Sequence, residues 1–127
     1  MRFGTMPKQG EILLVPVPYT DLQAVKRRPV LVLSNDHYNT TRNDILVASI
    51  TSNLTNNEFG VMLEPGDLED GTLSHASMIR FDKLHCLHQR IIVKRFGRLK
   101  REKYKAVVNK IQEFISQDDE GIQHANK

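Results

Sequence analysis

Short runs of apolar residues, each bounded by polar or turn-forming residues, recur along most of the chain. They occupy residues 11–17, 30–34, 45–51 and 59–63, while residues 77–84 alternate between apolar and polar positions and residues 90–96 form the last predicted strand. Runs of this length are too short for an ordinary helix and are typical of strands. The pattern therefore predicts five or six short β-strands.

Proline residues mark two of these predicted strands. The first run contains Pro16 and ends at Pro18, which is typical of an edge strand. Pro29 directly precedes the second run, and because proline fixes φ and lacks an N–H group, it predicts a sharp change from loop to strand. Arg28 is then expected where an outward loop, residues 19–27, meets the sheet.

Polar segments separate the later runs. Residues 35–39 predict a turn followed by about one helical turn. Residues 53–58 predict a polar loop, and residues 66–75 predict a long acidic connection between strands.

The hydrophobic period changes after Lys100. Apolar residues then recur at the i, i+3, i+4 and i+7 spacing of one helix face, at Tyr104, Val107, Val108, Ile111, Phe114 and Ile115. This spacing predicts a C-terminal amphipathic helix, whereas residues 117–127 have little to bury and are expected to fray. Strands and helix together predict a mainly β fold, a small twisted β-barrel with one packed helix.

The length and composition bound the class of protein. A chain of 127 residues predicts a single domain, with an ordered core at about 10–116 and flexible ends. The one cysteine, Cys86, has no partner for an internal disulfide, which fits a reducing cytoplasm. No signal peptide and no apolar run of membrane-spanning length is present, so a cytoplasmic protein without membrane association is expected.

The net charge of +3 is too small to indicate a nucleic-acid binder, but the charges are clustered. Cations gather at 26–28 and at 94–105, and acids gather at 64–70 and 118–120. The second basic run is suited to guide an RNA backbone. A solvated surface of mixed charge is the alternative interpretation.

Several side chains are candidates for chemistry. Arg80 and Asp82 are two positions apart on a predicted strand, so they share a face, as a reactive pair or as a surface ion pair. Thr51 ends a strand and offers one hydroxyl donor. His37 and His75 are surface residues or, at neutral pH, possible acids.

A metal site is not predicted. His85, Cys86 and His88 are capable ligands, but His85 and Cys86 face opposite sides of a strand and no second pair follows at a zinc-binding spacing. The sequence therefore predicts neither a metal nor another cofactor.

Seven short motifs occur in an order and spacing that resembles the PemK/MazF family of type II toxin–antitoxin ribonucleases, over about residues 10–116. The motifs are Gly-Glu-Ile at 10–12, Pro-Tyr-Thr-Asp-Leu at 18–22, Lys-Arg-Arg-Pro at 26–29, Leu-Val-Leu-Ser at 31–34, Ile-Thr-Ser at 50–52, Ile-Arg-Phe-Asp-Lys-Leu at 79–84 and Gly-Arg-Leu at 97–99. Better-known relatives carry a Glu-Gln-Gly-type loop before Arg-Pro, where this chain has residues 21–25. The functional roles of residues in the relatives' loop are therefore not assigned to residues 21–25 of this chain.

The resemblance implies the SH3-like barrel of PemK toxins and a homodimer that cuts single-stranded RNA at a short sequence until an antitoxin peptide covers the RNA groove. It implies catalytic roles for Arg28, Thr51, Arg80 and Asp82. The residues expected to contact RNA are Tyr19, Thr20, Asp21, Lys26, Ser52, Asn53 and Lys83.

RNA cleavage without a metal needs a base for the 2′-hydroxyl, cations for the phosphorane and a proton for the leaving 5′-oxygen, and it gives a 2′,3′-cyclic phosphate. Arg28 and Arg80 suit the cationic role because a guanidinium presents paired donors. Asp82 is the expected base if its pKa is raised. A neighbouring arginine lowers that pKa instead, and sequence leaves the conflict open.

Two other functions remain compatible with the same barrel. Gyrase-poisoning toxins resemble one another in a C-terminal Trp-Gly-Ile, whereas this chain has no Trp and ends in Ala-Asn-Lys. A non-catalytic barrel that binds nucleic acid or peptide is the third interpretation. Strand order, cleavage sequence and antitoxin do not follow from the sequence.

Overall fold

The structure, a computed structural model, describes residues 6–18, 25–55 and 58–117. Within these ranges the chain forms seven strands, two α-helices and two short 3₁₀ helices. The elements in chain order are β1 (Glu11–Pro18), β2 (Val25–Val32), α1 (Asp36–Thr41), β3 (Asp44–Thr51), β4 (Gly60–Leu63), η1 (Pro65–Asp67), β5 (Leu68–Gly71), β6 (Ser77–His88), η2 (Gln89–Ile91), β7 (Lys94–Leu99) and α2 (Arg101–Ile115). Neither α-helix among these residues has the length and apolar character needed to cross a membrane.

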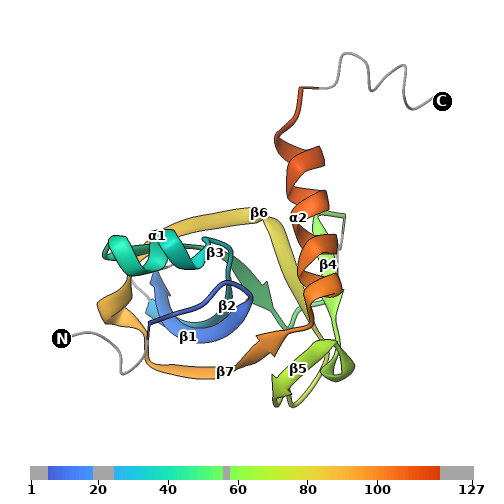
Figure 1. Ribbon diagram of the computed structural model, residues 1–127. Helices are drawn as coiled ribbons and strands as arrows, with labels where there is room; N and C mark the ends of the chain where they lie inside the picture. Colours follow the sequence, from blue (N-terminus) through green and yellow to red (C-terminus); the bar gives the residue numbers. More distant parts are fainter. Residues whose placement is uncertain (1–5, 19–24, 56–57, 118–127) are drawn as a thin grey trace.

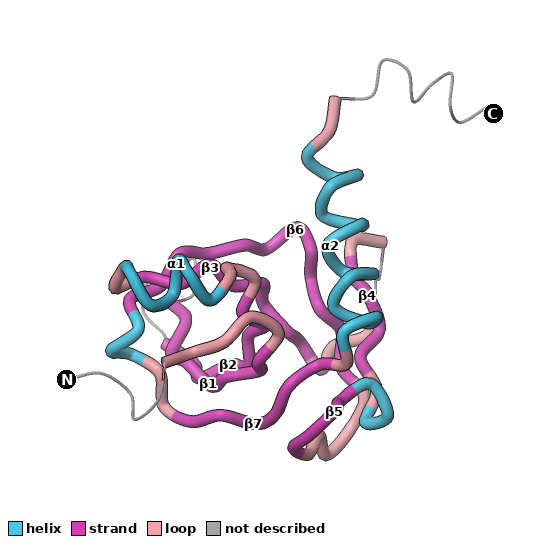
Figure 2. The backbone as a smooth tube through the Cα atoms, in the orientation of Figure 1, coloured by secondary structure: helices cyan, strands magenta, loops and turns pink. Residues whose placement is uncertain are grey.

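All the strands belong to one antiparallel sheet, ordered β4-β6-β3-β2-β1-β7-β5. The sheet curls so strongly that β6 arches over β3, β2 and β1 while β7 passes beneath them (Figure 1). The helix α1 lies at one end of this curl, and α2 stands at the other beside β4 (Figure 2). The prediction of a mainly β fold with a C-terminal helix is confirmed.

The central strands bury both of their faces, which explains why they appear in the sequence as continuous apolar runs. Alternate residues divide between two hydrophobic clusters. The first cluster takes Ile12, Leu31 and Ala48, and the second takes Leu13, Val30 and Val47, all fully buried.

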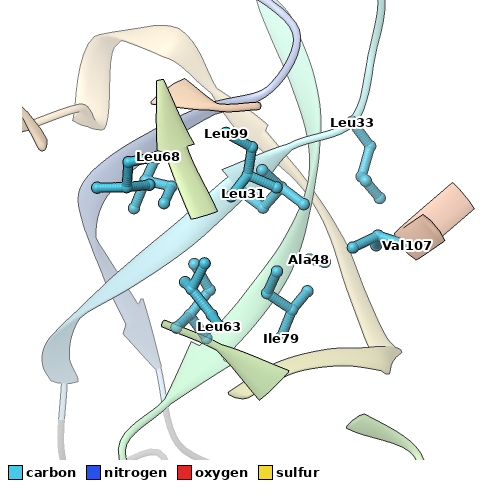
Figure 3. Packing of buried hydrophobic residues seen from close by; sticks show 10 residues of the cluster. Leu31, Leu33, Ala48, Leu63, Leu68, Ile79, Leu99 and Val107 are labelled. Carbon is cyan, nitrogen blue, oxygen red and sulfur yellow. The ribbon is translucent and has the colours of Figure 1, made fainter. Parts of the chain in front are cut away.

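The helix α2 covers the first cluster. Val107 is fully buried and points from α2 toward Ala48 (Figure 3). One turn earlier, the Tyr104 hydroxyl donates a 2.7 Å hydrogen bond to the carbonyl of Leu33, and burial raises the pKa of Tyr104 to about 12. The apolar face predicted for the helix is therefore the face that docks on the sheet.

The end of β6 and η2 enclose the second cluster. Gln89 is 2% exposed, and its amide nitrogen donates to the carbonyls of Asn39 (2.7 Å) and Arg42 (3.1 Å), which ties η2 to the end of α1. The strand predicted at 90–96 is thus wrong in its first part, because residues 89–91 form η2 and β7 begins only at Lys94.

Pro29 does not begin a strand, contrary to the prediction. The strand β2 starts at Val25, and Pro29 lies within it, opposite Leu14 of β1. The neighbouring strand β3 pairs with β2 only from Val30 onward, so position 29 does not have to donate a hydrogen bond to β3.

The acidic connection predicted at 66–75 contains η1 and β5, and it meets the basic run predicted at 94–105. Arg95 contacts Asp70 at 3.0 Å and Glu11 at 2.6 Å. Arg98 lies 4.0 Å from Glu69, and Lys103 lies 3.5 Å from Asp67. Acidic partners therefore neutralise several cations of the basic run at 94–105, which the sequence analysis considered as a guide for an RNA backbone.

Candidate functional site

The strands β2 and β3 diverge at one end of the sheet. Their pairing ends at Val30 and Ser49, although β2 extends back to Val25 and β3 continues to Thr51. A cavity of about 280 Å³, here named the fork cavity, opens between them. It is lined by residues 26–29 of β2, Ile50 and Ser52 from the end of β3, residues 72–75 of the β5–β6 connection, Ser77 of β6 and Phe96 of β7.

Arg28 and Thr51 flank this fork from its two strands. Val30 and Ser49 are paired, so Arg28 and Thr51, each two positions beyond that pair, are directed to the same face of the sheet. Arg28 is half-buried and contributes to the cavity lining. The structure thus brings together two residues that the sequence analysis singled out separately.

The hydroxyl of Thr51 keeps its hydrogen available. Its oxygen accepts a 3.1 Å bond from the backbone N–H of Asn53, so the hydroxyl proton can still be donated to a ligand. The Asn53 side chain instead accepts from the backbone and hydroxyl of Thr55, which assigns it to a turn. Ser52 lies between them and lines the fork cavity.

Arg80 and Asp82 form a two-point ion pair. Nε of Arg80 donates to one carboxylate oxygen at 2.9 Å and a terminal nitrogen donates to the other at 2.7 Å. The prediction that these side chains share a face is confirmed. Their side chains are 26% and 18% exposed, so the pair is partly shielded from water yet accessible to a ligand.

A large β-bulge in β6 carries Arg80 and Asp82. Ile50 pairs with Ile79 and Ala48 pairs with Leu84, which leaves the four residues 80–83 of β6 opposite the single β3 residue Ser49. Bulges re-aim side chains and are enriched beside active sites. The register of β6 therefore directs Arg80 and Asp82 away from regular pairing with β3.

The ion pair sets the ionisation of Asp82. Burial by itself would raise the pKa of its carboxyl, but the hydrogen bonds and positive charge of Arg80 outweigh burial, so the pKa is lowered. The carboxylate in turn raises the pKa of Arg80. A lowered pKa makes Asp82 a weaker base, the opposite of what a general base at neutral pH requires.

Three phenylalanines pack together at the bulge. Phe81 lies between Arg80 and Asp82 in the sequence and is 7% exposed. Its ring packs edge-on against Phe59 and Phe114, with ring centroids 6.0 and 5.8 Å away. Its backbone N–H also donates to the carbonyl of Phe59 at 3.0 Å. The sequence analysis assigned Phe114 to the helix face but had no signal linking it to Phe81.

Two histidines adjoin the site. His75 lines the fork cavity, with Nδ1 3.1 Å from the Ser74 hydroxyl. Nε2 of His85 lies 3.1 Å from the Ser49 hydroxyl, on the strand that carries Thr51. His85 was considered in the sequence only as a metal ligand, and Ser49 was not considered.

The predicted RNA contacts are placed unevenly. Lys26 is exposed at the fork cavity, and Lys83 is exposed in the bulge, where its charge also lowers the pKa of Asp82. Tyr19, Thr20 and Asp21 lie outside the described residues. Across the described ranges, no cluster of three His, Cys, Asp or Glu residues has the arrangement of a metal site.

Comparison with known proteins agrees with this architecture. MazF from Deinococcus radiodurans superposes with a TM-score of 0.71 at 20% identity, over 89% of this chain and 99% of that one. The Mycobacterium tuberculosis toxin MazF-mt6 gives 0.65 at 20% identity, over 81% and 93% of the two chains. A mycobacterial endoribonuclease solved with its cognate antitoxin gives 0.69 at 15% identity, over 87% and 98%. These likenesses confirm the predicted type of fold.

No curated protein matches the chain significantly in sequence. A family model described as PemK-like, MazF-like toxin of type II toxin–antitoxin systems, however, matches residues 8–115. That match spans every strand and helix of the described fold. The chain therefore belongs to the PemK/MazF-like family of type II toxin–antitoxin toxins.

Proposed function

We propose that this toxin is an endoribonuclease that cuts single-stranded RNA at a short sequence without a metal ion, leaving a 2′,3′-cyclic phosphate and a 5′-hydroxyl. The observation that carries the proposal is the placement of Arg28 and Thr51 on one sheet face at the fork. A gyrase poison or a passive binding barrel has no need of a phosphate-binding cation and a hydroxyl donor directed to one sheet face from two diverging strands.

The two arginines bind the scissile phosphate. Arg28 reaches it from the fork, and Arg80 reaches it from the bulge. Charge grows on the phosphoryl oxygens in the transition state, and donors already oriented toward those oxygens stabilise it without reorganising. The two hydrogen bonds from Asp82 hold the guanidinium of Arg80 in one orientation before RNA binds.

In this mechanism a group other than Asp82 removes the 2′-hydroxyl proton. The lowered pKa of Asp82 favours its role as the partner that orients Arg80. His75, which lines the fork cavity, is the next candidate, since a histidine ring nitrogen can donate or accept a proton. Thr51 donates its hydroxyl hydrogen to a phosphate oxygen or to the attacking oxygen.

The family membership also supports an inference about the partners. One of the similar structures is the mycobacterial endoribonuclease solved with its cognate antitoxin. We infer that an antitoxin protein also binds this toxin and inhibits it, and that the toxin acts as a homodimer in the cytoplasm.

The test is to incubate the purified protein with a long unstructured RNA and map the cut ends. Cuts at a short consensus, with cyclic phosphate on the upstream fragment and unchanged rates in EDTA, are the expected result. The Arg28→Ala protein serves as the inactive control. Absence of cutting, or inhibition by EDTA that magnesium reverses, would contradict the proposal.

A further inference from the structure

We propose that the fork cavity holds one nucleobase of the RNA beside the scissile phosphate, and that the hydroxyl groups on its rim select which base is accepted. This inference rests on the proposed nuclease function. It adds a specificity site, formed by β2, the end of β3 and the β5–β6 connection.

The charge of the cavity matches a nucleotide. Its β2 wall carries three consecutive cations, Lys26, Arg27 and Arg28, and none of the described residues that line it is acidic. Elsewhere the acids of η1 and β5 neutralise cations of α2 and β7, as Asp70 does for Arg95. A cavity lined by three cations and, among the described residues, by no carboxylate favours a ligand that carries phosphate.

The interior of the cavity suits a flat apolar group. Pro29 and Ile50 come from the two diverging strands, and Leu73 and Phe96 add apolar lining from the β5–β6 connection and from β7. At about 280 Å³ the cavity is slightly smaller than sites for drug-sized ligands, which run from about 300 to 1,000 Å³. It is therefore sized for a single base rather than several.

The rim provides hydrogen-bonding groups that can read the edge of a base. Ser52 and Thr72 are exposed, and their hydroxyls make no hydrogen bond within the part of the chain that the structure describes. Each hydroxyl can donate or accept. Ser77, in contrast, is buried and donates to the carbonyl of His75 at 3.4 Å, which supports the connection rather than a ligand.

The position of the cavity relative to Arg28 decides which base it reads. Arg28 lines the cavity and is also the cation proposed for the cut phosphate. A base bound in the cavity therefore belongs to a nucleotide next to the cut. Changing the rim should alter the preference at one position of the cleavage consensus and leave the other positions unchanged.

The experiment compares cut sites across a random RNA library for the wild type, Ser52→Ala, Thr72→Val and the conservative Thr72→Ser. Thr41→Val and Ser116→Ala are matched controls, because both residues are exposed and lie on or beside helices outside the cavity. Ser52→Ala or Thr72→Val should change base preference at one consensus position by about 10-fold or more, as loss of a specific contact does. Thr72→Ser should retain the wild-type consensus, and melting temperatures show that each variant is folded.

An unchanged consensus in both Ser52→Ala and Thr72→Val would overturn the inference while leaving the nuclease proposal intact. A change that weakens only antitoxin binding would also overturn it, since it would assign the cavity to a peptide. Base preference in binding is measured in parallel on the same library, so a wild type that binds without cutting still tests the cavity. A wild type that neither binds nor cuts RNA would overturn the cavity and the proposed function together.

Discussion

Ser49 and His85 join β3 and β6 at the base of the bulge that carries Arg80 and Asp82. Ser49 is the one β3 residue opposite the bulge, and His85 directly follows the pair that closes it. The hydroxyl of Ser49 and Nε2 of His85 are 3.1 Å apart. A side-chain hydrogen bond thus connects the two strands at the position where backbone pairing is interrupted.

Removing this bond should loosen the bulge without unfolding the protein. We expect Ser49→Ala to lower the free energy of unfolding by about 0.5–1.5 kcal/mol, the usual net contribution of one hydrogen bond. If the bond also fixes Arg80, kcat for RNA cleavage should fall while KM changes little. Urea unfolding and steady-state kinetics measure both quantities, with Thr41→Ala as the control. A variant equal to wild type in both would show that backbone contacts alone hold the bulge.

Arg28→Ala should lower the rate of cleavage by roughly 10²–10³, because it removes a donor that stabilises the transition state. Arg28→Lys should remain impaired, since an ammonium lacks the paired donors of a guanidinium. Arg90→Ala, a change at an exposed cation on η2, is the control and should retain activity. Growth arrest on expression, with melting temperatures alongside, measures the effect. Full toxicity of Arg28→Ala would exclude Arg28 from the site.

Two substitutions at Thr51 separate chemistry from packing. Thr51→Ser keeps the hydroxyl and should retain substantial activity, whereas Thr51→Val keeps the shape, loses the donor and should lose activity. Both variants are assayed on one RNA. Equal losses in the two variants would indicate that the β-branched shape of Thr51 matters rather than its hydroxyl.

The sequence predicted features that depend on local geometry and missed those that depend on distant pairing. Alternation along a strand was sufficient to place Arg80 and Asp82 on one face. The bulge that presents them was not predictable, because it depends on which β6 residues pair with β3. Pro29 was misplaced for the same reason, since its strand continues toward Val25 only because β1 pairs with it.

The fork cavity was also beyond sequence analysis. Its walls come from segments that are remote along the chain, with Ser52 at the end of β3 and Phe96 in β7. The motif at 26–29 identified only the cationic wall. The connection at 72–75, which closes the cavity, appeared in the sequence as an acidic linker and gave no sign of a site.

The ion pair with Arg80 should make the contribution of Asp82 to stability depend on pH. Its folded pKa is lowered from the ordinary value of about 3.9, so the contribution is complete above that value and disappears as the pH falls through the folded pKa. Asp82→Asn should therefore be less stable than wild type at pH 7, and the difference should shrink below about pH 4. Urea unfolding at several pH values tests this, and a difference independent of pH would contradict it.

The same variant distinguishes two roles for Asp82 in catalysis. If Asp82 only orients Arg80, Asp82→Asn should lose less activity than Arg80→Ala and keep the acidic limb of the kcat profile. If Asp82 removes the 2′-hydroxyl proton, the loss should reach roughly 10²–10⁴ and that limb should disappear. We expect the orienting role, and therefore the same acidic limb of kcat against pH in Asp82→Asn and wild type. His75→Gln is then the next variant to examine.

The close crossing of β5 and β7 gives the last prediction. Gly71 has φ +90°, and a Cβ atom there would lie 2.1 Å from the carbonyl oxygen of Phe96, so both the backbone angle and the space exclude a side chain. Gly71→Ala should therefore lower the free energy of unfolding by about 1–3 kcal/mol, as overpacking does. Gly66→Ala is the matched control, because no atom lies within 4 Å of a Cβ there. Thr72 directly follows Gly71, so at temperatures where the variant remains folded we also expect relaxed base selectivity in its cut sites. Wild-type stability in Gly71→Ala would show that β5 moves away from β7 at little cost.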